Sequence, residues 1–303
     1  MTPRARRRVV IVDASIWIFR AHFSLPAAIR DDLNRPAAAL QGWASVLLGE
    51  LARRPAAIGV AFDEALFTGF RHRLYPAYKA DRALPDEDLA GQLLRARAFA
   101  EALGLCTAAS EEFEADDLIA TAAARARAAD HAVEIVSRDK DLLQSVRAPD
   151  DVMREIDPTR FVDLAAAEAR FGVATGLIPD VQALSGDAID GIPGIRGIGA
   201  RTASQVIARY GPLESLYEAL EQDETALDGL RGAARVRQRL LEARREAFLF
   251  RELTRARDDA DVPFAPHAAP VPSPRREDVR QALAAVGLDG RLNTRVRAFP
   301  EAA

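Results

Sequence analysis

Three short apolar segments of this chain each end in an aspartate, and helix-forming stretches lie between them. "RVVIVD" ends at Asp13, "AAIGVAFD" at Asp63 and "HAVEIVSRD" at Asp139, while residues 37–53, 85–104 and 115–129 have helical patterns. This alternation is typical of an α/β fold with a mostly parallel sheet. Because ligands bind at the carboxyl edge of such sheets, the three aspartates are predicted to meet there. Each aspartate could instead simply cap the next helix, an alternative that explains one more easily than three.

Further acidic residues extend this prediction. The stretches "FEADDLIA" (113–120), "SRDKD" (137–141) and "GDAID" (186–190) bring the candidate carboxylates to nine: Asp13, Asp63, Glu114, Asp116, Asp117, Asp139, Asp141, Asp187 and Asp190. A set of oxygen ligands without His or Cys suits a hard cation, Mg²⁺ or Mn²⁺. Two such ions stabilise the attacking and leaving oxygens of a phosphoryl displacement. The acids therefore predict a site for two metal ions.

Composition narrows the class of protein. With 303 residues and 49% apolar residues the chain can bury a large core, and no apolar run approaches the ~18 residues of a membrane span. The N-terminal "MTPRARRRVVIVD" predicts a first core strand rather than a signal peptide. A single cysteine, Cys106, excludes an internal disulfide and a Cys-rich zinc site. We expect a cytoplasmic protein. Its net charge of −4 disfavours nucleic-acid binding unless the basic residues lie apart from the acids.

A basic and aromatic segment, "GFRHRLYPAYKADR" (69–82), supplies such bases. It interleaves cations with aromatic rings, a pattern that holds single strands, and the candidates for this role are Arg71, Arg73, Tyr75, Tyr78, Lys79 and Arg82. An ordinary solvated loop is the alternative. Only two of the 41 basic residues are lysines, Lys79 and Lys140, which makes both conspicuous.

The second half of the chain changes character after about residue 175. "GIPGIRGIGARTA" (191–203) lacks the third glycine of a dinucleotide fingerprint and follows no strand, so it predicts a hairpin between helices. Gly194, Gly197 and Gly199 allow close backbone approach, and the helix that starts at Ala200 can bind a phosphate together with Arg201 and Thr202. A purely structural turn stays open. We expect three parts: an α/β domain that carries most of the acids (1–175), a region with the glycine-rich hairpin and charged amphipathic helices (176–264), and a linker with a final helix (265–303).

Taken together, the motifs resemble the 5′→3′ exonuclease and flap endonuclease family, in particular the nuclease domain of bacterial DNA polymerase I. The matching stretches occur in the family's order: "VDASIWIFRAHFSLP", "AFDEALFTGFRHRLYPAYKADR", "EADDLIA", "SRDKDLLQSV" and "LSGDAIDGIPGIRGIGARTA". The resemblance covers essentially the whole chain. It implies that residues 1–175 form a PIN-like α/β nuclease domain and that residues 176–264 form a helix–three-turn–helix region that binds duplex DNA. No polymerase-like segment follows, which predicts a stand-alone nuclease.

The resemblance also implies roles for matching positions. One metal would take Asp13, Asp63, Glu114 and Asp116, the second Asp139, Asp141 and Asp187, and the extra acids of bacterial members match Asp117 and Asp190. Lys79, Arg82 and Arg20 would be catalytic, Phe19 would contact DNA, and loop carbonyls near the hairpin would hold a K⁺ ion. Three positions depart from the family pattern, Glu64, Arg138 and Gly191, and none of them removes a ligand.

The predicted function is metal-dependent hydrolysis of phosphodiesters near the 5′ end of flap or nicked DNA, in replication or repair. The expected enzyme is a monomer associated with the nucleoid, and an RNA–DNA hybrid is a further candidate substrate. Three rival functions fit the sequence less well. A non-catalytic protein that binds branched DNA would not need all nine acids, and PIN-type ribonucleases are usually shorter and lack the hairpin. An aspartyl-phosphate phosphatase needs Asp-x-Asp after the first strand, where Ala14 and Ser15 follow Asp13.

Overall fold

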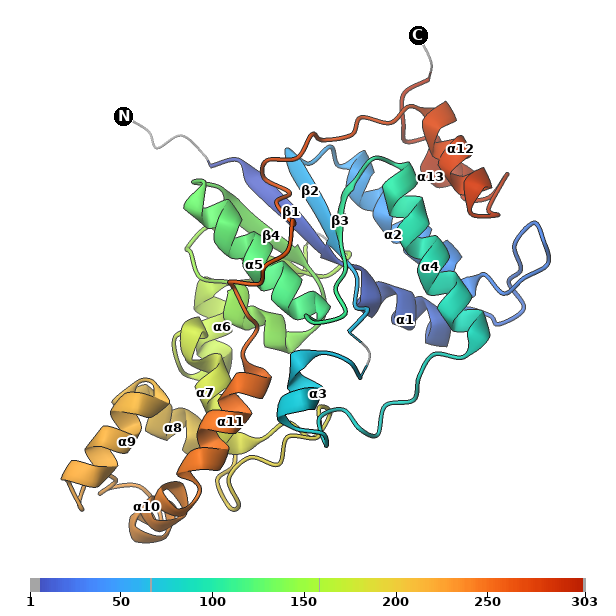
Figure 1. Cartoon of the computed structure of the whole chain (residues 1–303). Helices are drawn as coiled ribbons and strands as arrows, with labels where there is room; N and C mark the ends of the chain where they lie inside the picture. The colour runs from blue at the N-terminus through green and yellow to red at the C-terminus, as the bar shows by residue number, and fades with distance from the viewer. Residues whose placement is uncertain (1–5, 66, 158, 302–303) are drawn as a thin grey trace, which may run out of the picture.

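The centre of the molecule is a six-stranded sheet, seen edge-on among its helices in the computed structural model (Figure 1). The structure describes residues 6–65, 67–157 and 159–301. The strand order is β3-β2-β1-β4-β5-β6, and only β6 runs antiparallel to its neighbour. The strands are β1 (Arg8–Asp13), β2 (Ala57–Ala61), β3 (Cys106–Ala108), β4 (Ala132–Val136), β5 (Val152–Arg154) and β6 (Phe161–Asp163). The predicted mostly parallel α/β sheet is confirmed.

Strand β1 is apolar throughout because both of its faces are covered. Val9 and Ile11 belong to a core shared with α5, whereas Val10 and Val12 belong to a second core on the opposite face. The second core is formed with α1, α2 and α4, the helices to the right of the sheet in Figure 1. The bounds of these helices are α1 (Ala14–Ser24), α2 (Ala38–Ala52), α4 (Glu87–Ala102) and α5 (Ala115–Ala128). A strand buried on both faces has a continuous apolar sequence instead of an alternating one.

The strand order reverses at β1, which pairs with β2 on one side and β4 on the other. In open α/β sheets the crevice for a ligand lies at such a reversal, outside the carboxyl ends of the strands. The short helix α3 (Phe70–Leu74) and the 3-10 helix η1 (Lys140–Ser145) both follow strands at this edge. The fold therefore places the loops after β1, β2 and β4 around one crevice.

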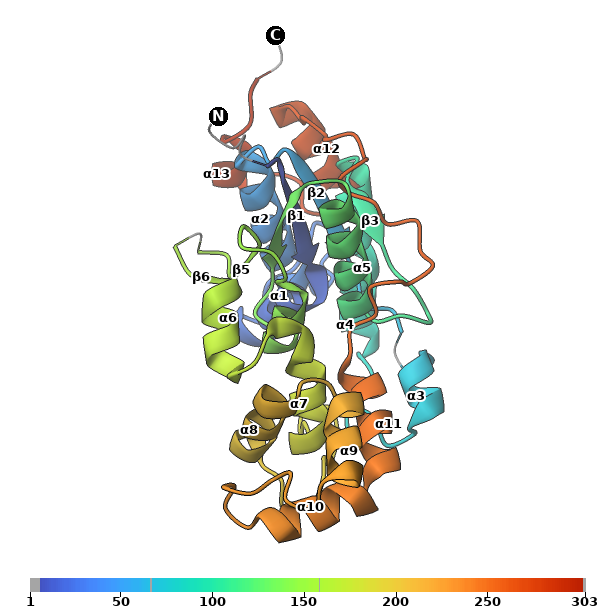
Figure 2. The ribbon, with the colours of Figure 1, turned by 90° about the vertical axis from the view of Figure 1, so that its left-hand side faces the viewer.

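A helical region lies below this carboxyl edge (Figures 1 and 2). It contains the 3-10 helix η2 (Thr175–Leu177) and the helices α6 (Leu164–Phe171), α7 (Ile178–Ser185), α8 (Ala200–Tyr210), α9 (Leu213–Gln222), α10 (Ala233–Glu242) and α11 (Arg244–Thr254). One face of α8 is buried through Ala203, Val206 and Ile207, while Arg201 and Arg209 are exposed. The expected helical region after the sheet is thus present, with its core continuous with the α5 side of the sheet.

The chain then returns along the sheet to its opposite end (Figure 2). Arg125 of α5 donates hydrogen bonds to the carbonyl oxygens of Ala260 and Phe264. Residues 265–274, the predicted linker, form no helix or strand but pack in place, since a Cβ on Gly59 of β2 would lie 2.3 Å from Pro266. The final helices, α12 (Arg276–Ala285) and α13 (Asn293–Val296), contact α4 and α2, respectively. Among the described residues, no helix combines the length and apolar character needed to cross a membrane.

Candidate functional site

Asp13 lies at the carboxyl end of β1, beside the end of β4. It is the last residue of β1 and caps α1 by accepting a hydrogen bond from the backbone N–H of Ile16 at 3.3 Å. Its other oxygen accepts the Ser137 hydroxyl at 2.7 Å, directly after β4. Burial raises the pKa of Asp13 to about 6, against the effect of these hydrogen bonds. The carboxylate is therefore held by both central strands, in surroundings that favour its neutralisation by a proton or a cation.

Glu114 is the N-cap of α5 and pairs with two side chains of the 69–82 segment. Its Oε2 atom accepts hydrogen bonds from Lys79 Nζ at 2.7 Å and from the Tyr78 hydroxyl at 3.0 Å. Burial would raise the pKa of Glu114, but the Lys79 and Arg71 cations outweigh it and hold the pKa below its usual value. Burial and the charge of Glu114 together raise the pKa of Asp63, after β2, to about 6. The charges of Asp63 and Glu114 therefore repel each other at close range.

The acids after β4 and on α5 face one another. The pKa of Asp116 is raised well above its ordinary value, mainly by burial and to a smaller extent by the charges of Asp139 and Asp13. Burial and Asp139 raise the pKa of Asp141 to about 6, and Gln182 of α7 donates to Asp141 at 2.5 Å. Five carboxylates from three segments also line one cavity of ≈ 20 Å³: Glu114, Asp116, Asp141, Asp187 and Asp190. The structure therefore brings the predicted acids together at one edge.

Cations stand among these acids. Lys140 Nζ lies 2.9 Å from Oδ2 of Asp187, and Arg82 Nη2 lies 2.8 Å from Oδ1 of Asp190. Burial raises the pKa of Asp190 in spite of the Lys79 and Arg82 charges. Burial also acts to raise the pKa of Asp187, but the hydrogen bond and charge of Lys140, together with backbone N–H donors, outweigh it and the pKa is lowered. Both lysines of the chain thus lie in the acidic site. In this arrangement their ammonium groups balance part of the negative charge.

The donor set fits hard divalent cations by its chemistry. All the acids offer oxygen, and the buried Oε1 atom of Gln182, beside Asp141, has no hydrogen-bond partner. Within residues 6–65, 67–157 and 159–301, no three His, Cys, Asp or Glu side chains converge on a point that could hold a metal ion directly. Magnesium commonly keeps several of its waters, so carboxylates at longer range can still bind it through water. The site accordingly suits a hydrated ion better than a fully dehydrated one.

Asp117 has a different environment from the other eight acids. Its side chain is fully buried, and its two oxygens accept four hydrogen bonds: from Arg71 Nη1 at 2.7 Å and Nη2 at 2.8 Å, from the backbone N–H of Glu114 at 3.0 Å and from that of Arg257 at 2.8 Å. A carboxylate offers about four lone-pair sites, so these donors saturate it. The predicted role of Asp117 as a metal ligand does not fit these contacts.

Two predicted DNA contacts are buried as well. Arg71 is 3% exposed and binds Asp117, and Tyr78 is 2% exposed with its hydroxyl on Glu114. Neither side chain can reach DNA, so these two assignments were wrong: sequence cannot distinguish a buried cation or ring from a surface one. Arg73 is exposed and pairs with Glu112, while Tyr75 packs edge-on against Phe250.

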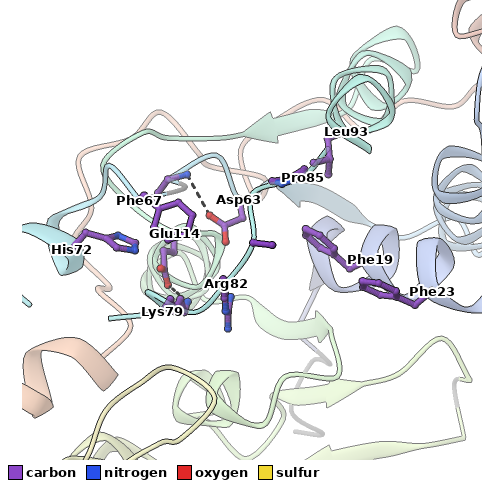
Figure 3. Close-up of a pocket in the computed structure, with 12 residues that line it drawn as sticks. Phe19, Phe23, Asp63, Phe67, His72, Lys79, Arg82, Pro85, Leu93 and Glu114 are labelled. Atoms are coloured by element: carbon purple, nitrogen blue, oxygen red, sulfur yellow. Dashed lines mark hydrogen bonds and ion pairs between the residues drawn. The ribbon is translucent and has the colours of Figure 1, made fainter. Parts of the chain in front are cut away.

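A second, larger cavity adjoins the acids and has apolar walls (Figure 3). Its volume is ≈ 390 Å³, and Lys79, Arg82, Asp63 and Glu114 line it together with Phe19, Phe23, Ala65, Phe67, His72, Ala83, Pro85 and Leu93. Figure 3 shows Phe19 and Phe23 of α1 facing the Phe67 and His72 side across the cavity. Phe23, Phe67 and His72 were missed from sequence. For Phe23 the signal was its spacing of four from Phe19, which places both rings on one helix face.

Other predicted contacts lie around this centre. Arg20 is exposed, with its guanidinium 5.7 Å from the centre of the Trp17 ring. Arg201 lines a cavity of ≈ 510 Å³ that also touches Lys140 and Asp187, so the start of α8 opens toward the acids. Thr202, the next residue of α8, is half-buried.

The three glycines of the hairpin differ in what surrounds them. Gly194 has a φ of +64°, and a Cβ there would lie 2.3 Å from the backbone nitrogen of Gly186, so tight packing within the protein already requires glycine. At Gly197 a Cβ would collide with the flexible Arg239 side chain. Gly199 is exposed, caps α8 and has nothing within 4 Å of the Cβ position. Only Gly199 is thus open enough for close approach by a ligand.

Comparison with known proteins places the chain in a family. The 5′-3′ exonuclease N-terminal resolvase-like domain matches residues 8–172, and the 5′-3′ exonuclease C-terminal SAM fold matches residues 173–277. DNA polymerase I of Rhizobium leguminosarum is 39% identical over 216 residues, which are 69% of this chain and 21% of that protein. DNA polymerase I of Deinococcus radiodurans is 34% identical over 230 residues, 76% and 24% of the two chains. The chain thus spans about a quarter of these relatives' length.

Solved structures agree on the fold. The T5 D15 protein co-crystallised with metal ions superimposes with a TM-score of 0.63 at 20% identity, over 96% of this chain and 97% of that one. The catalytic core of Rad2 in complex with DNA substrate gives 0.60 at 16% identity, over 97% and 92%. At this level of identity the likeness establishes the arrangement of the sheet and the helical region that follows it.

Proposed function

The chain belongs to the 5′-3′ exonuclease family and is a nuclease, and we propose that it hydrolyses phosphodiesters near the 5′ end of flap or nicked DNA. This proposal depends on one observation. Eight carboxylates, all the predicted acids except Asp117, come from five segments to one edge of the sheet, beside a cavity with apolar and cationic walls. Phosphodiester hydrolysis needs a concentrated negative site for metal ions and cations for the phosphate, and this edge offers both.

We propose two Mg²⁺ or Mn²⁺ ions as cofactors. The T5 D15 protein has been crystallised with metal ions, and a T5 5′-exonuclease with zinc. Asp13, Asp63, Glu114 and Asp116 would hold one ion, and Asp139, Asp141 and Asp187 the other, with Asp190 as an outer acid. When bound, such ions stabilise the charge of the attacking and leaving oxygens.

The chain's own cations would act on the scissile phosphate. Lys79 and Arg82 both line the larger cavity and both pair with acids, so their positive charges are fixed before substrate binds. Charge that is fixed in advance favours the transition state without reorganisation at the moment of reaction. Arg20 and Phe19 on α1 would contact the strand that enters the cavity, with Arg73 and Tyr75 further along its path.

Duplex DNA would bind across the helical region. The start of α8, with Gly199, Arg201 and Thr202, opens toward Asp187 through the ≈ 510 Å³ cavity, so a phosphate held there would lie on a path to the acids. The core of Rad2 has been crystallised with DNA substrate. A K⁺ ion at the hairpin, action on RNA–DNA hybrids, a monomeric state and a nucleoid-associated location in the cytoplasm stay predictions.

A cleavage assay with end-labelled 5′-flap, nicked-duplex and RNA substrates, with Mg²⁺ and with EDTA, tests this proposal. We expect Mg²⁺-dependent products from the flap and the nick, and much weaker cleavage of RNA. Binding of the flap without any cleavage would favour a non-catalytic branched-DNA-binding protein. Cleavage of RNA in preference to the flap would favour a PIN-type ribonuclease.

A further inference from the structure

The end of helix α11 is tied to the acid site through a buried arginine. Arg71, 3% exposed, donates hydrogen bonds to the carbonyl oxygens of Leu253 at 2.9 Å and Arg255 at 2.7 Å. The same guanidinium binds both oxygens of Asp117, and the backbone N–H of Arg257 donates to Asp117 as well. We call residues 253–257 the α11 end segment. Through this arginine, the segment is fixed to the first turn of α5.

A second buried side chain ties the same segment to the other group of acids. Gln144 of η1 is 2% exposed; its Oε1 accepts from the backbone N–H of Ala256 at 2.8 Å, and its Nε2 donates to the carbonyl oxygen of Thr254 at 3.0 Å. Nε2 also donates to the carbonyl oxygen of Asp141 at 2.9 Å. All five residues of the α11 end segment therefore use a backbone group to bind Arg71, Asp117 or Gln144.

The hydrogen bonds of Asp117 and Gln144 reach the backbone of two acids of the proposed metal sites, Glu114 and Asp141. The N–H of Glu114 donates to Asp117 at 3.0 Å, so the Arg71–Asp117 pair fixes the backbone of an acid of the first proposed metal site. Gln144 fixes the backbone of Asp141, an acid of the second. We infer that Arg71, Asp117 and Gln144 are positioning residues that use the α11 end segment to set the spacing between the two acid groups. The inference rests on the proposed function.

The two acid groups lie on separate elements, so their spacing stays fixed only if some part of the protein is bonded to both. Glu114 is the N-cap of α5 and Asp141 lies in η1, and these elements follow different strands. Functional groups act only when held within about 0.5 Å of the productive geometry, and losing an outer partner of a metal ligand typically costs about 10-fold to 100-fold in metal affinity or activity. The α11 end segment is hydrogen-bonded on the side of both groups and can fix the distance between them.

The chain offers a matched control for a purely structural effect. Gln92 of α4 is also 2% exposed and accepts hydrogen bonds from the backbone N–H groups of Ala39 at 2.9 Å and Leu40 at 3.3 Å. It lies in the core between α2 and α4, away from the acids. Gln92→Ala and Gln144→Ala thus remove comparable buried amides, and of the two only Gln144 contacts a segment that carries an acid of the proposed metal site.

The test compares full-length wild-type protein with Gln144→Ala, Arg71→Lys and Gln92→Ala. Four quantities are measured: Mn²⁺ binding to the free protein by electron paramagnetic resonance, single-turnover flap cleavage against Mg²⁺ concentration, flap binding in EDTA, and thermal unfolding. Gln144→Ala and Arg71→Lys are expected to weaken Mn²⁺ binding and slow cleavage by about 10-fold or more, with flap affinity within about two-fold. Gln92→Ala should lower the unfolding temperature and leave Mn²⁺ binding and the cleavage rate of the folded protein unchanged.

Two results would overturn the inference. The first is Mn²⁺ binding and cleavage at wild-type levels in folded Gln144→Ala and Arg71→Lys. If Gln144→Ala does not fold, Arg71→Lys, which keeps the positive charge, decides the question. The second is an equal kinetic loss in Gln92→Ala, which would indicate general loosening of the fold. A wild-type protein that cleaves no DNA would refute the proposed function instead, and the Mn²⁺ measurements would still test the positioning.

Discussion

The Nζ atom of Lys79 lies 2.7 Å from Oε2 of Glu114 and 3.7 Å from Oδ2 of Asp190, and 11% of the Lys79 side chain is exposed. Its backbone is equally constrained, with φ at +51° and the N–H donating to the carbonyl oxygen of Asp190 at 2.9 Å. Burial would lower the pKa of Lys79, but the two acids outweigh it and raise the pKa. A permanently charged ammonium is therefore fixed at the wall of the larger cavity.

Replacing this compact charge should impair catalysis more than binding. The wide, planar guanidinium of Arg does not fit where one ammonium sits between two carboxylates. We predict that Lys79→Arg keeps flap affinity within a few-fold and slows single-turnover cleavage by roughly ten-fold or more, about 1.4 kcal/mol of barrier. Lys79→Ala should lose on the order of 10²-fold. Rapid-quench measurements at saturating enzyme check both values.

Lys140→Arg is the matched comparison, because the Lys140 side chain is 40% exposed beside Asp187 and leaves room for the larger group. Its cleavage defect should be smaller than that of Lys79→Arg. A Lys79→Arg enzyme with wild-type turnover, together with a Lys79→Ala defect that disappears at high salt, would mean that Lys79 only steers DNA from a distance.

Gly199→Val should weaken the binding of duplex substrates. A side chain there meets no protein atom within 4 Å, so the fold tolerates it, but it would obstruct a phosphate at the start of α8. Fluorescence anisotropy should show weaker binding of flap and nicked duplex and a smaller change for short single strands. Gly91→Val on α4, where the Cβ position is equally open, should bind like wild type. Equal losses on duplex and single strand would point to a folding defect.

Metal binding should depend on pH through the buried aspartates. Burial raises the pKa of Asp13, Asp63 and Asp141 to about 6, above the ordinary value of 3.8. The folded, metal-free protein thus binds more protons than the unfolded chain between these values, and loses stability as pH rises through them. A divalent cation competes with these protons. We predict that Mg²⁺ raises the unfolding temperature clearly at about pH 7.5 and little at about pH 5.

The readout is the difference between melting curves with and without Mg²⁺ at each pH. Glu50, whose pKa burial raises to about 7, lies outside the acid site and changes both curves alike. A Mg²⁺ effect of the same size at both pH values would show that the buried aspartates do not take up the ion.

Removing the charge of Asp117 should destabilise the metal-free protein. Asp117→Asn removes the carboxylate charge that binds the buried Arg71 guanidinium through two hydrogen bonds, and breaking one side of such a pair costs about 3–5 kcal/mol. Urea unfolding in EDTA measures this loss, and the double variant Arg71→Met/Asp117→Leu should recover part of it. If Asp117 were a metal ligand like its neighbours, its removal would relieve repulsion among acids and leave the metal-free protein as stable or more so.

The sequence predicted the elements whose apolar pattern is long enough to identify them. Strands β1, β2 and β4 and helices α2, α4 and α5 lie where expected, because continuous apolar runs and helical periodicity locate them. Strands β3, β5 and β6 have three residues each, too few to show a period, and they were missed. Their place depends on pairing with neighbours that are distant in sequence.

The sequence predicted those site residues whose position follows from the order of the strands. It did not predict those whose position depends on contacts between side chains. The acids after parallel strands had to meet at the carboxyl edge, and they do. Arg71 was assigned to DNA because its segment is basic, but its partner Asp117 lies 46 residues away and buries it. Likewise, Gln144 and Gln182 carry no charge, so no sequence pattern distinguished them from other amides.

Single-turnover cleavage of a 5′ flap by Asp139→Asn, with flap binding measured in EDTA, tests most directly whether the acids bind the metal ions that drive hydrolysis. The asparagine can still accept the hydrogen bond that the Asp141 N–H donates at 2.9 Å, so only a negative charge is lost. We predict no detectable cleavage at any Mg²⁺ concentration. Flap affinity should equal that of wild type or be tighter, because the repulsion between the site and the phosphate falls. A folded Asp139→Asn protein that cleaves at the wild-type rate, or that fails to bind the flap, would contradict the metal role of these acids.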